Sequence, residues 1–226
     1  MSTHGFFITG TDTGTGKTTI SCALLHAAAE LGLSTVAMKP VSAGCRILPA
    51  GKFNDDALML QQCMNTDIDY GLINPYALTA PVSPHLAAQK DGVEIDLEWI
   101  ATLHRRLSQQ ADFHIVEGIG GWLTPLSADH TVADMARRLA LPVILVVSIR
   151  LGCLSQALLT YESITARHLT IAGWVANICN DGELYIDENI LTLAQRLPAP
   201  CVGRLPYSRN ADARQLAGHL DLDKLL

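Results

Sequence analysis

The sequence predicts an α/β fold in which a doubly wound, mainly parallel sheet is flanked by helices. The first observation is a series of short, nearly continuous apolar segments, which are typical of parallel strands buried on both faces. The second observation is that segments with helical periodicity lie between them, so that strand and helix alternate along the 226 residues. Folds of this kind bind ligands beyond the carboxyl ends of their strands, and function is therefore expected in the segments that follow each strand.

Six apolar segments are predicted as strands. The first, GFFITG, precedes a glycine-rich stretch, and the third, FHIVEG, ends beside an acidic residue. The predicted strands cover residues 5–10, 34–41, 113–118, 142–148, 171–178 and 200–206.

Four of the intervening segments carry helix signals. The segment 18–31 repeats apolar residues with a helical period and is followed by Gly32, a typical helix stop. Asp96 is expected to cap a helix that runs through residue 107, and Thr131 with Asp134 forms a capping box for another. Ser155 is expected to cap a helix to about residue 167. The apolar faces are predicted as Ile20, Ala23, Leu24, Ala27, Ala28 and Leu31 in the first helix, and as Val132, Met135 and Leu139 in the third.

The stretch GTDTGTGKTT, residues 10–19, lies between the first predicted strand and the first helix, which is the context of a phosphate-binding loop. The standard spacing places four residues between the first glycine and Gly-Lys-Ser/Thr, whereas five residues separate Gly10 from Gly16 here. Backbone amides of such a loop hold an anion at a helix N-terminus. Lys17 would bind β- and γ-phosphate oxygens, and the Thr18 hydroxyl would complete a Mg²⁺ shell.

A fold of the P-loop NTPase type follows from this loop. Since 49% hydrophobic residues are enough for a sizeable core, we expect residues 1–226 to form a single P-loop α/β domain. The segments 43–54 and 70–92 are rich in Pro, Gly and Ser and are expected to be long loops near the ligand crevice.

The net charge of −6 excludes a broad basic surface for nucleic acid or an anionic membrane. A bound phosphate would therefore be held locally, and small molecules are the expected partners. No apolar run approaches the length of a membrane span, and the N-terminus lacks the pattern of a secretory signal, so a cytoplasmic location is expected. The six cysteines are scattered without a C-x-x-C pair, which argues against a disulfide framework or a zinc site.

Two acidic residues are candidates for a Mg²⁺ site beside the loop threonine. Glu117 ends the predicted strand FHIVEG and precedes a glycine-rich turn, and Asp56 opens a helix in FNDDALML. Mg²⁺ prefers such hard oxygen ligands. The alternatives are that Glu117 is a surface turn acid and Asp56 a first-turn helix acid, with Asp55 as the competing choice.

Two further polar residues stand at strand ends. Lys39 precedes Pro40, which interrupts regular strand pairing, and a lysine buried there is costly unless it meets an anion. A substrate carboxylate, carbamate or phosphate would satisfy it, and the alternative is a lysine that snorkels to solvent. Asn177 ends GWVAN, where its amide could contact an adenine edge or merely cap a turn.

These motifs together resemble the dethiobiotin synthetase family over essentially the whole chain. The resemblance is carried by GTDTGTGKTT, KPV, DAL, VEGIGGWLTPL, LPVILVV, LGCL and GWVAN, in that order, and the loop is similar to the family's own G-x-x-x-x-x-G-K-T variant. It implies a homodimer that uses ATP and Mg²⁺ to close 7,8-diaminononanoate and CO₂, or bicarbonate, into a cyclic urea. The intermediates would be a carbamate and a carbamic-phosphoric anhydride.

The resemblance also implies roles for individual residues. Lys39, Lys17 and Thr13 would be the catalytic residues, with Thr13, Lys39, Ser42 and Ala43 near the diamine or its carbamate and a metal held by Thr18, Asp56 and Glu117. The nucleotide would contact Gly14, Thr15, Gly16, Lys17, Thr18, Thr19, Asp56, Glu117, Gly118, Ile119, Gly120, Asn177, Pro206, Tyr207 and Ser208, the last three near adenine.

Two positions depart from the family pattern. Ala43 stands where the family usually has a substrate-contacting serine, and the hydroxyl lies one place earlier, at Ser42. Ser155 replaces an asparagine expected to reach the substrate of the partner subunit, and this shorter donor could require a bridging water.

The main alternative function is a P-loop switch ATPase of the partitioning or septum-positioning type. Those proteins carry a signature lysine five residues before the loop lysine, and Asp12 occupies that place here, where it would repel transferring phosphates. A GTP-binding switch is disfavoured because VANIC contains no N-K-x-D set. Enzymes that amidate cobalamin precursors share the fold type but add a glutaminase domain, for which this chain has no room.

Overall fold

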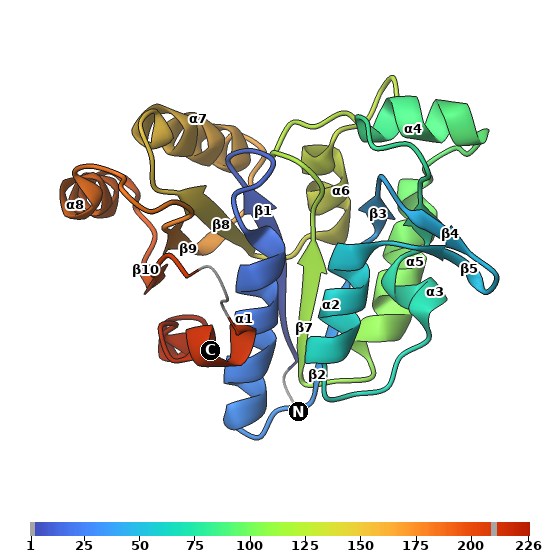
Figure 1. Cartoon of the computed structure of the whole chain (residues 1–226), viewed down its shortest axis with the longest axis horizontal. Helices are drawn as coiled ribbons and strands as arrows, with labels where there is room; N and C mark the ends of the chain where they lie inside the picture. Colours follow the sequence, from blue (N-terminus) through green and yellow to red (C-terminus); the bar gives the residue numbers. More distant parts are fainter. Residues whose placement is uncertain (1–2, 209–211) are drawn as a thin grey trace.

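The fold centres on a six-stranded parallel sheet, shown in Figure 1. The computed structural model describes residues 3–208 and 212–226. The strand order is β10-β9-β8-β1-β7-β2, and every neighbouring pair is parallel. The strands are β1 (His4–Gly10), β2 (Thr35–Met38), β7 (Phe113–Glu117), β8 (Val143–Ser148), β9 (Ile171–Asn177) and β10 (Cys201–Leu205). The predicted doubly wound α/β class is confirmed.

The strand order creates a switch point at β1. The chain runs from β1 to the edge strand β2, returns to β7, and then proceeds through β8, β9 and β10 to the opposite edge. The segments that follow β1 and β7 therefore emerge side by side at the carboxyl edge of the sheet. Ligands of doubly wound folds bind at such a point.

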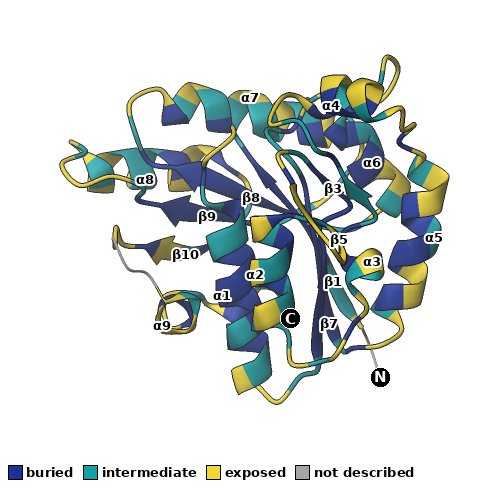
Figure 2. Cartoon of the chain, turned by 45° about the vertical axis from the view of Figure 1, so that its right-hand side comes forward, coloured by how far each residue is buried: buried dark blue, intermediate teal, exposed yellow. Residues whose placement is uncertain are grey.

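Both faces of the sheet are buried, as the dark strands of Figure 2 show. Phe6 and Ile8 of β1 belong to the apolar layer beneath α1 (Lys17–Glu30), whereas Phe7 belongs to the layer on the other face. Each central strand contributes apolar side chains to both layers, so its sequence reads as a continuous apolar run.

Helix α1 follows the phosphate-loop candidate directly. Gly16 is its N-cap in the left-handed conformation, and the first five residues of the predicted apolar face are buried. Leu31 is 56% exposed, so its place on that face was wrongly predicted. The helix ends at Glu30, and the turn at Gly32, with φ 83°, rotates Leu31 out of register with the face.

The other predicted helices are found, one of them with a different start. Asp96 caps α5 (Leu97–Ser108) by accepting from the amides of Glu98 and Trp99, and Thr131 forms the capping box of α6 (Val132–Leu139). Helix α7 (Cys153–Thr165) begins before Ser155, which is therefore not its cap. Gly152, in the left-handed conformation with φ 91°, turns the chain into the helix, and its carbonyl accepts from the amide of Gln156. The C-terminal elements are α8 (Ile186–Arg196), α9 (Ala213–Ala217) and η1 (Leu222–Lys224).

The predicted strand 34–41 is divided in two by Pro40. Strand β2 ends at Met38, the Lys39 amide donates to the Ile73 carbonyl instead of a sheet neighbour, and β3 (Val41–Ser42) pairs with β6 (Tyr76–Ala77) in a separate small sheet. Proline lacks the amide that a continuous strand would need. The chain therefore leaves the main sheet at Lys39.

The segments 43–54 and 70–92 contain regular structure, which corrects the expectation of long loops. The first holds an antiparallel hairpin of β4 (Arg46–Leu48) and β5 (Gly51–Phe53), followed by α2 (Asp55–Cys63). The second holds α3 (Tyr70–Ile73), β6 and α4 (Pro84–Asp91). Within the described part of the chain, no helix has the length and apolarity needed to cross a membrane.

Candidate active site

A cavity of about 710 Å³ opens where the segments after β1, β2 and β7 meet. Its walls come from the start of α1, the start of α2 and residues 81–84, which lead into α4. Thirteen of the residues predicted for the site line it: Thr13, Gly14, Gly16, Lys17, Thr18, Thr19, Lys39, Ser42, Ala43, Asp56, Glu117, Ile119 and Gly120.

The phosphate-loop candidate is shaped by two left-handed glycines and one asparagine. Gly14 and Gly16 have φ values of 73° and 87°, which favour glycine. The Asn177 side-chain amide donates to the Thr15 carbonyl over 2.8 Å, and a Cβ at Gly16 would overlap that amide nitrogen. Asn177, at the end of β9, therefore supports the loop from behind.

Lys17 is folded back over its own loop. Its side chain is buried, and Nζ donates to the Asp12 carbonyl over 3.0 Å. Burial and then the positive charge of Lys39 lower the pKa of Lys17 to about 8, although nearby carboxylates act in the opposite direction. An anion at this position would restore the preference for the charged ammonium.

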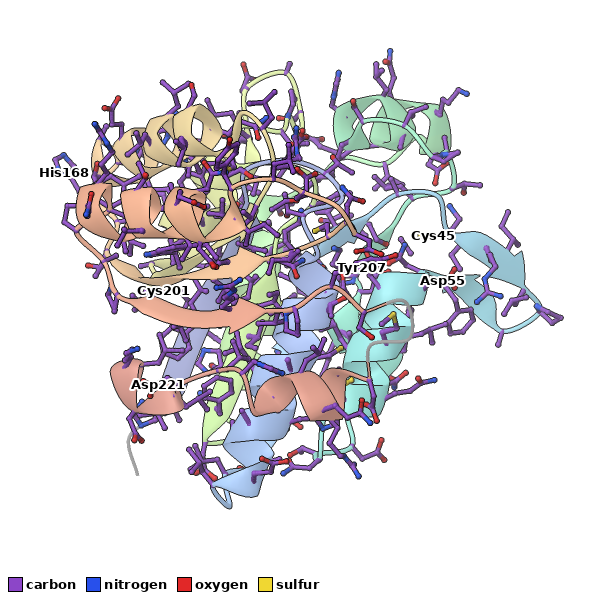
Figure 3. All side chains as sticks on the ribbon, turned by 60° about the vertical axis from the view of Figure 1, so that its left-hand side comes forward. Cys45, Asp55, His168, Cys201, Tyr207 and Asp221 are labelled. Carbon is purple, nitrogen blue, oxygen red and sulfur yellow. The ribbon has the colours of Figure 1, made fainter. Side chains whose placement is uncertain are left out.

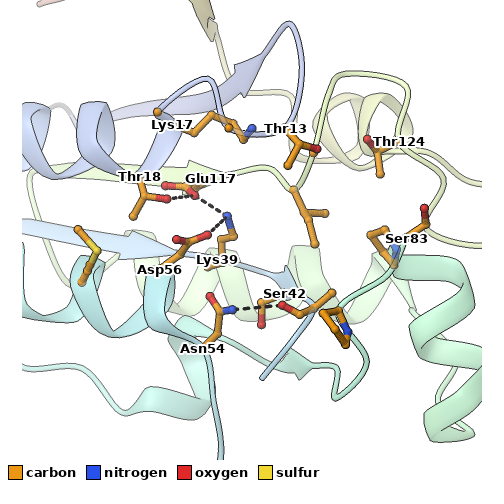
Figure 4. A pocket seen from close by; sticks show the side chains of 18 of the residues that line it. Thr13, Lys17, Thr18, Lys39, Ser42, Asn54, Asp56, Ser83, Glu117 and Thr124 are labelled. Atoms are coloured by element: carbon orange, nitrogen blue, oxygen red, sulfur yellow. Dashed lines mark hydrogen bonds and ion pairs between the residues drawn. The ribbon is translucent and has the colours of Figure 1, made fainter. Parts of the chain in front are cut away.

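Lys39 lies at the centre of a charged cluster, shown in Figure 4. It is 3% exposed, and Nζ pairs with Glu117, with Asp56 Oδ2 over 3.3 Å and with the Gly118 carbonyl over 3.2 Å. Burial lowers the pKa of Lys39, but the charges of Glu117 and Asp56 outweigh it, so that the pKa is raised overall. Lys39 is thus a buried ammonium and does not snorkel to solvent.

Three oxygen donors beside Lys39 fit a Mg²⁺ ion. The Thr18 hydroxyl donates to Glu117 Oε1 over 2.8 Å, and Asp56 approaches the same cluster through Lys39. Glu117 is fully buried, and its Oε2 has no hydrogen-bond partner among the described residues. The described residues contain no group of three or more His, Cys, Asp or Glu suited to a metal. Two carboxylates and a hydroxyl are nevertheless what Mg²⁺ uses when phosphates and waters supply its other ligands.

The structure shows which of the two acids at the start of α2, Asp55 or Asp56, lies at the candidate metal site. Asn54 caps this helix by accepting from the Ala57 amide. Asp56 lines the cavity, whereas Asp55 turns outward and pairs with Arg46 over 2.6 Å on the exposed hairpin. Only Asp56 is placed to act with Glu117.

Ser42 and Ala43 both line the cavity, but neither presents a free hydroxyl group to it. Ser42 is fully buried, and its hydroxyl donates to Asn74 Oδ1 over 2.8 Å and lies 3.2 Å from Cys45 Sγ. Its donor capacity is therefore used by the protein. Ala43 presents only a methyl group, so neither residue supplies a free hydroxyl at this wall.

Six of the expected nucleotide residues lie outside the cavity lining. The Asn177 side chain donates a hydrogen bond to the Thr15 carbonyl, on the side of the loop away from the cavity lining. The Gly118 carbonyl accepts a hydrogen bond from Lys39. The other three, Pro206, Tyr207 and Ser208, follow the carboxyl end of β10 and are exposed; Figure 3 labels Tyr207.

Several lining residues were not found from the sequence. They come from segments other than the phosphate loop: Asn54, Met59, Pro81, Val82, Ser83, Pro84 and Thr124. A local signal for part of this wall did exist, because Ser83 followed by Pro84, with Gly92 at the end, is typical of a short helix.

Asp12 is held in place by its neighbours in the loop and beyond it. Its Oδ1 accepts from the Thr13 amide over 2.7 Å, and its Oδ2 lies 3.5 Å from Arg150. Arg150 also donates to Gln156 over 3.2 Å. The position that carries a lysine in the switch ATPases is therefore a carboxylate directed toward Arg150.

Comparisons with known proteins identify the family of this chain. A protein-family model described as "AAA domain" matches residues 4–215. The chain is 49% identical over 224 residues to the "ATP-dependent dethiobiotin synthetase BioD" of Pseudomonas aeruginosa, with 97% of each chain covered. It is 46% identical over 226 residues to the protein of the same name from Cellvibrio japonicus, with 100% of this chain and 99% of the relative covered.

Solved structures share the fold at low sequence identity. A MinC:MinD cell division complex from Aquifex aeolicus has a TM-score of 0.58 at 16% identity, covering 91% of this chain and 82% of its own. A ParA family ATPase from Chlorobium tepidum has a TM-score of 0.56 at 15% identity, covering 99% and 94%. These likenesses show a P-loop NTPase fold and nothing further about activity.

Proposed function

Because the chain belongs to the ATP-dependent dethiobiotin synthetase family and is therefore a ligase, we propose that it joins CO₂ to 7,8-diaminononanoate in three steps. One amine of the substrate attacks CO₂ and forms a carbamate. A carbamate oxygen then attacks the γ-phosphorus of ATP, and ADP leaves. The second amine attacks the carbonyl carbon of the resulting mixed anhydride, and phosphate leaves with the closure of the cyclic urea.

The observation that carries this proposal is the pair of buried lysines, Lys17 and Lys39, that line one cavity. Lys17 belongs to the phosphate loop, and Lys39 is held by Glu117 and Asp56 at the end of β2. A carbamate and a γ-phosphate both carry negative charge, and the transfer between them needs alignment and charge neutralisation more than covalent help. Two ammonium groups facing one cavity supply that.

Lys39 would bind the carbamate. The charge of Lys39 is neutralised by Glu117 and Asp56, and a carbamate entering the cavity would replace part of that pairing. Thr13 and Ala43 line the same space and would contact the diamine. A carbamate held against Lys39 would have its oxygen directed at the phosphate loop.

Thr18, Asp56 and Glu117 would hold the Mg²⁺ ion. Bound there with the nucleotide, the ion would neutralise charge on the β- and γ-phosphate oxygens. Glu117, which now accepts from Thr18 and pairs with Lys39, would hold the ion with its carboxylate, and the Lys39 ammonium would then be available to substrate.

The nucleotide would lie along the loop, with phosphates on the amides of residues 14–19. Its base would extend toward Asn177 and toward Pro206, Tyr207 and Ser208, which emerge at the same edge of the parallel sheet. Ile119 and Gly120 line the cavity and would contact the nucleotide.

A homodimer would complete the site. Three leucines that follow β7, follow β8 or lie on α7 are exposed: Leu123, Leu151 and Leu159 are 51%, 94% and 64% accessible. Leu123 and Leu159 also line a neighbouring hollow of about 380 Å³ together with Thr13. Burial of this surface against a second copy would bring the partner's α7 toward the substrate. A cytoplasmic location is consistent with a reaction that consumes ATP.

The switch ATPase alternative has less support. The relatives with that activity share only the fold, at 15–16% identity. Asp12 occupies the position of their signature lysine and faces Arg150.

One assay distinguishes the two functions. The purified chain receives ATP, Mg²⁺ and bicarbonate, with or without 7,8-diaminononanoate, and ADP and the mass of the organic product are measured. We expect ADP release to depend on the diamine and to match the cyclic urea in amount. ATP hydrolysis at an equal rate without the diamine would support the switch ATPase instead.

A further inference from the structure

Asn74 is a buried asparagine that is not part of the cavity lining. It is 3% exposed and caps the end of α3, where its amide donates to the Tyr70 carbonyl over 2.9 Å. Its side-chain Nδ2 donates to the Lys39 carbonyl over 2.6 Å. Its Oδ1 accepts from the Ser42 hydroxyl over 2.8 Å and from the Tyr70 hydroxyl over 3.2 Å. Because a backbone carbonyl can only accept, the nitrogen faces Lys39 and the orientation of the side-chain amide is fixed.

The first branch of this network holds the chain where it leaves the main sheet. The Lys39 amide donates to the Ile73 carbonyl over 2.8 Å, and the Lys39 carbonyl accepts from Asn74. Pro40 has no amide and cannot continue the pairing of β2. The Asn74 side chain spans this interruption, with Lys39 on one side and Ser42 on the other. Both backbone polar groups of Lys39 are therefore held by two consecutive residues.

The second branch reaches the helix that carries Asp56. The Tyr70 hydroxyl, which donates to Asn74, accepts from the Asn54 amide over 2.9 Å. Asn54 is the N-cap of α2, and its side chain accepts from the Ala57 amide. Asp56 lies in the first turn of this helix. The start of α2 is thus connected to Asn74 through one hydroxyl group.

The two branches end at the two partners of one ion pair. Lys39 Nζ lies 3.3 Å from Asp56 Oδ2, although the residues are 17 positions apart and belong to different elements. We propose that Asn74 is a positioning residue that sets the places of Lys39 and Asp56 relative to each other without contacting substrate. The inference rests on the proposed function, in which Lys39 would meet a carbamate and Asp56 a Mg²⁺ ion.

Loss of each branch should have its own kinetic signature. Displacement of Lys39 affects alignment in phosphoryl transfer, and a shift of about 1 Å at a reacting centre can cost roughly a hundredfold in rate. Displacement of Asp56 weakens metal binding instead. The first change should lower kcat, and the second should raise the Mg²⁺ concentration needed for ADP binding.

Asn74→Leu tests both branches together, because leucine has a similar volume but neither donor nor acceptor. We expect kcat to fall roughly tenfold or more, with KM for ATP unchanged, and the Mg²⁺ requirement for ADP binding to rise. Calorimetric Mg-ADP titration counts the active sites, so that an unfolded fraction is not mistaken for a low kcat. Asn74→Ser, which fills less space and admits water, carries the same expectation should the leucine variant not fold.

Tyr70→Phe tests the second branch alone. The substitution keeps the ring, whose centroid lies 4.8 Å from that of Phe53, and removes only the hydroxyl between Asn54 and Asn74. We expect the Mg²⁺ concentration for half-maximal ADP binding to rise roughly fivefold, with kcat at saturating Mg²⁺ close to the native value. A native Mg²⁺ requirement in this variant would overturn the link from Asn74 to Asp56.

Asn65→Leu is the matched control for a purely structural role. The exposed Asn65 supports the amino end of β2, where its Oδ1 accepts from the Thr35 amide over 2.7 Å and its Nδ2 donates to the Leu33 carbonyl over 2.9 Å. This variant should unfold at a lower urea concentration and keep the native kcat, KM and Mg²⁺ requirement. The proposal is overturned if Asn74→Leu behaves in the same way.

Failure of the proposed function would give a different result. The native chain itself would then show no diamine-dependent turnover. The Mg²⁺ titrations with ADP do not involve the diamine, so a native requirement in Asn74→Leu would still overturn the role of Asn74, and a raised requirement would still support it.

Discussion

Asn177 at the end of β9 donates a 2.8 Å hydrogen bond to the Thr15 carbonyl in the phosphate loop. The bond joins two segments 162 residues apart and fills the space that a side chain at Gly16 would need. The loop conformation thus depends on a side chain that sequence analysis assigned to an adenine edge or a turn.

Asn177→Ala should weaken binding of any polyphosphate, because the loop loses its support whichever base is attached. We expect Kd to rise roughly tenfold for Mg-ADP and for Mg-tripolyphosphate alike, the cost of about one buried hydrogen bond. Calorimetric titration measures both, with Asn180→Ala in the following exposed loop as the control. A loss restricted to Mg-ADP would show that Asn177 reads the adenine and does not support the loop.

Lys39→Gln should abolish turnover by removing the ammonium that would neutralise the carbamate. We expect kcat to fall by at least about a hundredfold, as for other removed charge-stabilising donors, while circular dichroism stays unchanged. Lys52→Gln is the matched control, because Lys52 is a partly exposed lysine paired with Asp91 away from the cavity. If Lys39→Gln retains turnover, the role of Lys39 is only to neutralise the charges of Glu117 and Asp56.

Thr18→Val should raise the Mg²⁺ requirement. The substitution keeps the shape of the side chain but removes the hydroxyl that contacts Glu117 over 2.8 Å. We expect the Mg²⁺ concentration for half-maximal ADP binding to rise roughly tenfold. Thr18→Ser restores the oxygen and should recover the native value. If the valine variant titrates like the native chain, Thr18 is not a metal ligand.

Leu159→Glu should separate the proposed dimer. Leu159 lies on α7, is 64% exposed and borders the hollow beside Thr13. A charge placed in a buried apolar interface is costly, so sedimentation should show monomers with the substitution and dimers without it. The control is Leu191→Glu, at an exposed leucine of α8. A native chain that sediments as a monomer would contradict the dimer directly.

The parts of the fold that sequence analysis predicted are those with local causes. A parallel strand buried on both faces is continuously apolar, the capping box of Thr131 and Asp134 is complete within four residues, and the phosphate loop lies between its own strand and helix. Pro40 ends the strand as expected from its missing amide, whereas the sequence left open whether Lys39 is buried, because that depends on the distant carboxylates of Glu117 and Asp56. The helix start at Gly152 was missed because a serine two residues into the helix offered a more familiar cap.

The parts that could not be predicted depend on contacts between distant segments. Ser42 donates to Asn74 and so cannot offer its hydroxyl to the cavity, which its neighbours in sequence do not reveal. The segment that leads to the cavity wall at Ser83 is joined to the segment after Lys39 by the pairing of β3 with β6, a contact between residues distant in sequence. The choice between Asp55 and Asp56 depends on which one Arg46 engages across the hairpin.

His104 of α5 and His114 of β7 form a buried pair that should make the fold sensitive to acid. Their ring centroids are 5.0 Å apart, and three of their ring nitrogens, His104 Nε2 and both nitrogens of His114, lack a partner among the described residues. Burial lowers the pKa of each ring from 6.5 to about 4, and the charge of His104 adds to the effect on His114. Both rings are therefore neutral in the folded chain at neutral pH.

The contribution of these two histidines to the free energy of unfolding should consequently be fully present above pH 6.5 and should decrease as the pH falls toward 4. In that window the unfolded chain binds protons that the folded chain excludes, and below about pH 4 both states are protonated, so the loss from this pair stops. A shift of this size corresponds to at most about 3 kcal/mol for each ring. Urea titrations between pH 4 and 7 measure it. The double variant His104→Leu, His114→Leu should lose most of this slope, whereas His219→Gln, at an exposed histidine, should keep it. An unchanged slope in the double variant would assign the acid sensitivity to other groups.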